Sequence, residues 1–203
     1  MEHEFYDYQV LNGQLRTSLS AVVGAIDHAV SMNVNVISLS IGFLPSACSN
    51  TDWDSADSPL YAAIDRAGQA GVVVVTSAGN DGEDLLETPQ YPAAYVSLNN
   101  LVSVGALECI AEKPTRFSNF GNEVVDLFTT GAFVTVYYDF CWHEIHGTSF
   151  ATSIVAGKAA IHFAQAESPT EVLSLLRSQV RPFEVGEQYS IYGIVDTETD
   201  GEG

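Results

Sequence analysis

The chain of 203 residues is 46% hydrophobic and only 16% charged, a composition that fits one globular domain and excludes a coiled coil or a disordered chain. Its 26 acidic residues against 7 lysines and arginines give a formal net charge of -19, which argues against nucleic acid as a partner because phosphate binding needs clustered basic side chains. No apolar run approaches the roughly 20 residues that a membrane-spanning helix needs, so no membrane contact is expected.

The first part of the chain predicts a strand, a helix and a second strand. Residues 1–4 are acidic where a signal peptide would be basic, so we expect no export signal there, and the compartment stays open. Residues 5–11 predict a strand. Residues 17–32 place alanine, valine and isoleucine side chains at helical spacing, and residues 34–40 are rich in β-branched side chains up to Gly42, which is typical of a buried strand.

A second helix and two further strands follow. Ser58 and Pro59 are typical of an N-cap and a first helical residue, and Gly71 marks the end of that helix. The four valines at residues 72–75 show no polar alternation, which indicates a parallel strand covered on both faces, and residues 101–106 predict another strand. The alternation of helices and apolar strands predicts an α/β fold with a mostly parallel sheet, whose ligands bind beyond the carboxyl ends of the strands.

A serine lies at the start of the last strongly apolar helix. Residues 146–152 read His-Gly-Thr-Ser-Phe-Ala-Thr, and residues 154–157 continue with Ile-Val-Ala-Gly. Such a serine exposes its hydroxyl on a sharp turn, while the helix N-terminus supplies N–H groups and partial positive charge for a developing oxyanion. Taken alone, Ser149 fits the simpler role of a helix cap equally well.

An asparagine follows the four-valine strand in the sequence Thr-Ser-Ala-Gly-Asn-Asp-Gly, residues 76–82. A side-chain amide at the carboxyl end of a buried strand can donate a hydrogen bond to a bound carbonyl oxygen. Asn80 could also serve the turn itself, because asparagine tolerates left-handed backbone.

These two segments and residues 35–42 resemble the nucleophile, oxyanion-hole and substrate-binding motifs of the subtilisin-like serine protease family, peptidase S8. The matches run in family order from about residue 8 to residue 160. The resemblance implies a three-layer α/β fold, a peptide or protein substrate, Ser149 as the nucleophile and Asn80 as the oxyanion donor. It also implies an S1 pocket with Gly79 in one wall and, in the facing wall, Ser40, Ile41 and Gly42. Phe43 stands where the family often has a second glycine, so we expect a narrower or partly covered pocket.

Two motifs of the family do not occur in this sequence. Family members carry an aspartate near the end of the first core strand and a His-Gly-x-His helix, both before the strand that residues 8–11 resemble. The expected fold therefore lacks the N-terminal strands and the catalytic histidine helix. We interpret Asp7, His3, His28 and His162 as residues without a catalytic role. Either His143 or His146 would have to meet the Ser149 hydroxyl at about 2.6–3.2 Å to act as a base, which a nearby loop histidine rarely does.

Two functions follow from the resemblance. The first is a serine endopeptidase that works through an acyl-enzyme on Ser149, once the missing aspartate and histidine come from an N-terminal segment or from a second chain. The second is an inactive pseudoprotease that binds extended peptides or a protein partner. In either case residues 1–195 form one partial peptidase S8 domain, and residues 196–203 form a loose acidic tail.

The missing segment and the acidic loops suggest further partners. Without the N-terminal strands an apolar sheet edge is uncovered, so we expect self-association or a complementary chain. The chemistry requires no cofactor. For one acidic loop the sequence fits two interpretations: its carboxylates bind calcium, or they are simply solvated. The carboxylates of that loop are Asp81, Glu83, Asp84 and Glu87.

Overall fold

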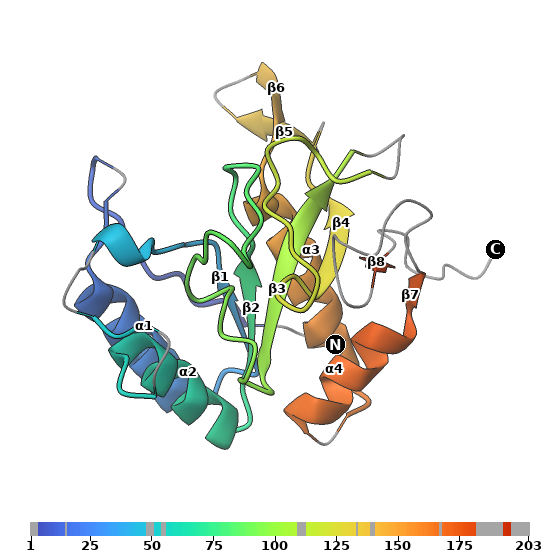
Figure 1. Cartoon of the computed structure of the whole chain (residues 1–203). Coiled ribbons are helices and arrows are strands. Elements are labelled where there is room, and N and C mark those ends of the chain that lie inside the picture. Colours follow the sequence, from blue (N-terminus) through green and yellow to red (C-terminus); the bar gives the residue numbers. More distant parts are fainter. Residues whose placement is uncertain are drawn as a thin grey trace.

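The computed structural model describes residues 4–14, 16–47, 51–53, 56–108, 113–132, 134–138, 141–166, 168–181 and 193–195. Helices and strands alternate along most of the chain (Figure 1). The predicted tail, residues 196–203, lies outside the described residues. In chain order the elements are α1 (Leu19–Ser31), β1 (Val36–Leu39), η1 (Pro45–Ala47), α2 (Pro59–Gln69), β2 (Val73–Ser77), β3 (Leu101–Leu107), β4 (Leu127–Thr130), β5 (Val134–Tyr138), β6 (Cys141–Ile145), α3 (Thr148–His162), α4 (Pro169–Ser178), β7 (Val180–Arg181) and β8 (Gly193–Val195).

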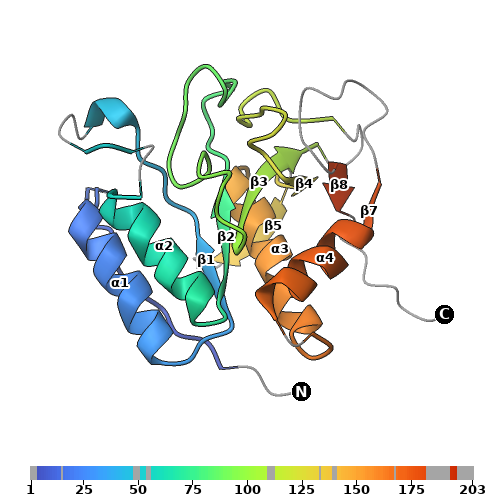
Figure 2. The ribbon, with the colours of Figure 1, turned by 60° about the horizontal axis from the view of Figure 1, so that its bottom comes forward.

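One mixed sheet forms the middle layer, with strand order β1-β2-β3-β4-β8-β7. Its first five strands in that order run parallel, and β7 pairs antiparallel with β8. Figure 2 shows α1 and α2 on one face of this sheet, and α3 and α4 on the other. Strands β5 and β6 form a separate antiparallel hairpin, which stands above the carboxyl ends of β2 and β3 in Figure 1. The predicted three-layer α/β fold with a mostly parallel sheet is confirmed.

The valine run explains why β2 lies inside the sheet, between β1 and β3. Val74 packs into the core cluster beneath α1 and α2, whereas Val73 and Val75 pack into the cluster beneath α3 and α4. Each of these side chains is fully buried. A strand covered on both faces needs apolar residues at every position, so the lack of polar alternation correctly predicted its place.

The two helices of the first layer begin where the sequence predicts. The Ser18 hydroxyl caps α1 by accepting a hydrogen bond from the Ala21 N–H, at 3.2 Å. Helix α2 begins at Pro59 and is followed by Gly71, whose φ of +85° favours glycine. Ser58 occupies the N-cap position, but its hydroxyl hydrogen-bonds the Tyr95 hydroxyl at 2.8 Å and does not cap the helix.

The strand predicted over residues 5–11 is wrong, because none of these residues belongs to a strand in the structure. A strand needs a neighbour for its N–H and C=O groups. At this side of the sheet β1 is the edge strand, and residues 4–14 do not pair with it. Phe5 is 93% exposed as a result. No helix among the described residues is both long and apolar enough to cross a membrane.

Candidate active site

Ser149 lies in the first turn of α3, directly after the β5–β6 hairpin. Gly147 is the N-cap residue with φ +153° and ψ +151°, and its N–H donates to the Gly131 carbonyl at 2.8 Å. A Cβ atom on Gly131 would lie 2.9 Å from the Gly147 carbonyl oxygen, so the two glycines allow the two backbones to approach closely. Ser149 is half-buried at the N-terminus of the helix, where the helix dipole favours negative charge.

Asn80 follows β2 and is held against the start of α3. Its Oδ1 atom accepts hydrogen bonds from the Thr148 N–H at 2.9 Å and from the Thr148 hydroxyl at 3.1 Å. A backbone N–H can only donate, which identifies the accepting atom as the amide oxygen and turns Nδ2 away from Thr148. Within the described residues Nδ2 makes no hydrogen bond, so both of its N–H donors remain available beside Ser149.

Asn119 shapes the loop that carries Asn80. Its side chain is fully buried, with Oδ1 accepting from the Asp81 and Glu83 N–H groups at 3.0 Å each. Its Nδ2 donates to the Ala78 carbonyl at 2.9 Å, and its backbone N–H donates to the Gly79 carbonyl at 3.0 Å. Sequence analysis did not identify this role. The buried amide satisfies a turn that would otherwise leave polar groups unpaired.

The residues predicted to line the substrate site lie together at the carboxyl ends of the parallel strands. Ser40, Ile41 and Gly42 follow β1, while Gly79 follows the neighbouring parallel strand β2. The hydroxyl of Thr76 donates to the Leu39 carbonyl at 3.1 Å and ties the two strand ends together. Parallel strands bring their carboxyl ends to one edge, which is why these segments meet near Asn80.

The Phe43 side chain turns into the core, and the narrower or partly covered pocket expected from its place in the sequence stays a prediction. Its side chain is 7% exposed and stacks on Trp53, with ring centroids 5.7 Å apart. Trp53 in turn stacks on Tyr91 at 5.5 Å, so the three rings form part of the core beside α2. The Phe43 side chain therefore stabilises the segment after β1 from within the core. It does not fill the space between the ends of β1 and β2.

The contacts of four histidines bear on whether this chain carries a base for Ser149. His28 contacts the Tyr8 hydroxyl at 2.9 Å, and His162 contacts Gln179 at 3.2 Å near the far end of α3. His143 lies on β6, and His146 lies 3.5 Å from the Glu144 carboxylate. In the part of the chain that the structure describes, the Ser149 hydroxyl makes no hydrogen bond to a histidine. That Asn80 donates to an oxyanion and that the base comes from outside this chain both stay predictions.

The loop considered for calcium uses its carboxylates within the protein. Asp81 Oδ2 accepts a hydrogen bond from Gln90 Nε2 at 2.6 Å, and Asp84 Oδ1 accepts one from the Leu86 N–H at 3.0 Å. Among the described residues, no three histidine, cysteine, aspartate or glutamate side chains cluster in a way that could hold a metal ion. Calcium binding stays a prediction.

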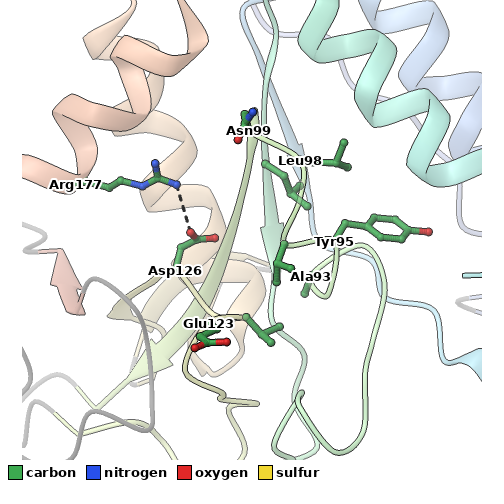
Figure 3. Close-up of a pocket in the computed structure, with 10 residues that line it drawn as sticks. Ala93, Tyr95, Leu98, Asn99, Glu123, Asp126 and Arg177 are labelled. Atoms are coloured by element: carbon green, nitrogen blue, oxygen red, sulfur yellow. Dashed lines mark ion pairs between the residues drawn. The ribbon is translucent and has the colours of Figure 1, made fainter. Parts of the chain in front are cut away.

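A cavity lies at the amino ends of β3 and β4, opposite the carboxyl ends of the strands (Figure 3). Asp126 and Arg177 form an ion pair there at 3.5 Å, and Asp126 Oδ2 accepts hydrogen bonds from the Ser103 N–H at 2.8 Å and hydroxyl at 3.1 Å. Burial raises the pKa of the Asp126 carboxyl above its ordinary value, and the bonds from Ser103 and the charge of Arg177 oppose that rise. This cavity lies at the amino ends of β3 and β4, whereas Ser149 and Asn80 lie near the carboxyl ends of the strands.

Comparisons with known proteins agree on one family. The model of the Subtilase family matches residues 2–186. The chain is 30% identical to subtilisin DY of Bacillus licheniformis over 176 residues, which cover 86% of this chain and 58% of that protein. It is also 30% identical to the major intracellular serine protease of Bacillus subtilis (strain 168), over 81% of this chain and 50% of that protein. Thermitase of Thermoactinomyces vulgaris matches at 30% over 84% of this chain and 55% of its own length.

Solved structures show the same likeness. A cold adapted subtilisin-like serine proteinase superposes with a TM-score of 0.75 at 27% identity, over 94% of this chain and 66% of that one. The prenylagaramide maturation protease PagA superposes with a TM-score of 0.74 at 27% identity, over 92% and 67%. The chain spans only half to three fifths of the length of the curated relatives named above.

Proposed function

Since this chain belongs to the subtilase family, we propose that it forms the part of a serine endopeptidase that carries the nucleophile Ser149 and the oxyanion donor Asn80. Ser149 Oγ would attack the scissile carbonyl carbon and lose its proton to a histidine from a segment outside this chain. The carbonyl oxygen would become an oxyanion that accepts a hydrogen bond from Asn80 Nδ2. The same histidine would then protonate the leaving amine, and water would release the acyl group from Ser149.

One observation carries this proposal: the hydrogen bonds from Thr148 to Asn80 join two segments 68 residues apart into one site. They place an available amide donor beside the first turn of the helix that bears the serine. A structural scaffold would not require an asparagine oriented in this way. Ser40, Ile41, Gly42 and Gly79 would form the walls that bind the substrate side chain next to the scissile bond.

The binding function remains a second candidate because Ser149 lacks a base within the described residues. Strand β1 forms the sheet edge, and an extended peptide could add to it as a further strand. On this alternative, the chain would hold a peptide or protein partner without cleaving it. The two functions differ in whether supplying a base produces hydrolysis.

To test the proposal, a segment that bears the family's aspartate and His-Gly-x-His motifs is added to this chain, either as a separate polypeptide or fused ahead of Met1. We expect hydrolysis of a fluorogenic peptide that is abolished by Ser149→Ala. Ser153→Ala is the matched control, because its hydroxyl bonds the Ser149 carbonyl at 3.0 Å one turn along the same helix. Retention of hydrolysis in Ser149→Ala would overturn the nucleophile assignment. Peptide binding without hydrolysis in the completed protein would favour the second candidate.

A further inference from the structure

A buried asparagine holds the backbone on both sides of Asn80. Asn119 donates hydrogen bonds to the carbonyl groups of residues 78 and 79, from Nδ2 at 2.9 Å and from its backbone N–H at 3.0 Å. Its Oδ1 accepts bonds from the N–H groups of residues 81 and 83, at 3.0 Å each. The turn that presents Asn80 is therefore built on one residue from a distant part of the chain.

Asn119 is itself fixed within the core. Its side chain is fully buried, and the hydroxyl of the neighbouring Ser118 accepts a bond from the Ala106 N–H on β3 at 2.9 Å and donates to the Asn119 carbonyl at 3.0 Å. A Cβ atom on Gly79 would overlap Asn119 Nδ2, and Gly79 has a φ of +105° that favours glycine. The turn therefore has little freedom to move relative to Asn119 and β3.

The position of this turn decides whether the Asn80 amide reaches the start of α3. Thr148 is the first residue of α3, so its N–H has no partner within the helix. That N–H donates to Asn80 Oδ1 at 2.9 Å and so determines which end of the amide remains available beside Ser149. Hydrogen bonds weaken as they lengthen, so a shift of the turn would release the amide and let it rotate.

We propose that Asn119 is a positioning residue for the oxyanion donor, and that it acts on the reaction only through the orientation of the Asn80 amide. This inference rests on the proposed function, which makes Asn80 the donor. In the part of the chain that the structure describes, Asn119 makes no hydrogen bond to Ser149, and because it is fully buried it cannot touch a substrate. Loss of its bonds should therefore weaken the stabilisation of the oxyanion, and only as long as Asn80 is present.

The first test follows the Thr148 N–H in the whole chain and needs no catalytic base. Its hydrogen exchange is measured by NMR on ¹⁵N-labelled protein, relative to an amide in the middle of α3. Asn119→Leu keeps the size of the side chain without its bonds, and we expect Thr148 exchange to rise roughly tenfold against that reference. Asn100→Leu should leave the ratio unchanged. It is the matched control, because the buried Asn100 side chain likewise bonds two backbone carbonyls, those of Ile64 and Val72, at the amino end of β3.

A second variant keeps this test decisive if Asn119→Leu does not fold. Asn119→Ala leaves space for water to reach the freed N–H groups, which lowers the cost of leaving them without a protein partner. The exchange of the Thr148 N–H should rise in this variant as well. An unchanged ratio in a folded Asn119 variant, or an equal rise in Asn100→Leu, would overturn the inference.

The second test is a double-mutant cycle on kcat in the enzyme completed with the family's missing segment. Asn119→Ala should lower kcat roughly tenfold when Asn80 is present and should cause no further loss in the Asn80→Ala background. An equal loss in both backgrounds would contradict the inference, because Asn119 would then act on the fold as a whole and not through Asn80.

The two tests separate this inference from the proposed function. Faster exchange of Thr148 in the Asn119 variants, together with a completed protein that cleaves no peptide, would refute the proposed function and still support the positioning of Asn80 by Asn119. Unchanged exchange of Thr148 would refute the positioning, even in a completed protein whose kcat depends on Asn80.

Discussion

At the scale of single residues, the orientation of one amide decides what the site can do. Asn80 has an oxygen that could bind a donor and a nitrogen that could bind an oxyanion. The two bonds from Thr148 occupy the oxygen and leave the nitrogen available. Asn119 also holds the turn that carries Asn80, because its buried side chain bonds backbone groups from Ala78 to Glu83.

We predict that Asn80→Ala lowers kcat of the completed enzyme by about 10²–10³, the loss measured for such a donor in subtilisin. The KM value should change little, since the amide acts chiefly on the oxyanion of the tetrahedral intermediate. Steady-state kinetics check both parameters. Asn99→Ala is a suitable control, because Asn99 lines the cavity at the opposite edge of the sheet. An effect on KM alone would make Asn80 a binding or turn residue.

At the scale of elements, one largely buried carboxylate connects β3, β4 and α4. Asp126 precedes β4, accepts hydrogen bonds from Ser103 on β3, and pairs with Arg177 on α4. Its pKa is raised chiefly by burial, so the folded protein favours the protonated carboxyl more than the unfolded chain does. The stability that this group contributes is therefore fully present below the ordinary pKa and is lost as pH rises through the raised value.

We predict that Asp126→Asn, which has the shape of the protonated carboxyl, removes this part of the pH dependence. Relative to the unaltered chain, the variant should gain free energy of unfolding as pH rises from about 4. Urea denaturation of both proteins across that range measures the difference. Asp65→Asn on α2 controls for the loss of one negative charge. A difference that stays constant with pH, or that moves the other way, would contradict the raised pKa.

At the scale of the whole molecule, the surface shows two apolar regions that a larger assembly could cover. Strand β1 forms one edge of the sheet, and the segment before α1 exposes Phe5. On the β5–β6 hairpin, Trp142 is 71% exposed and contacts Tyr137 with ring centroids 5.1 Å apart. Exposed aromatic groups and open sheet edges favour association with another chain.

We predict that the purified chain self-associates and reacts very slowly with a fluorophosphonate probe, because no described histidine hydrogen-bonds the Ser149 hydroxyl. Light scattering measures the molar mass, and intact mass spectrometry follows the labelling. Ser149→Ala provides the background for the probe. Rapid, stoichiometric labelling of Ser149 on a stable monomer would refute this prediction, and it would imply that a residue of this chain, such as His143 or His146, acts as the base.

The sequence by itself determined the features that depend on local pattern. The bounds of helix α2 follow from Pro59 and Gly71, because start and end signals act within one turn of a helix, whereas the cap bond expected of Ser58 does not form. The buried place of β2 follows from its four valines, since both faces of a central parallel strand are apolar. The family was likewise readable from contiguous segments around Ser149 and Asn80, because each motif lies within a few residues of sequence.

Only the tertiary structure decided which residues meet across long separations. Residues 5–11 have the composition of a strand yet form none, because pairing requires a neighbour that sequence pattern does not supply. Phe43 turns into the core because Trp53 and Tyr91 offer it a stack. The roles of Thr148 and Asn119 depend on hydrogen bonds between residues 36 to 68 positions apart, and their geometry exists only once the chain has folded.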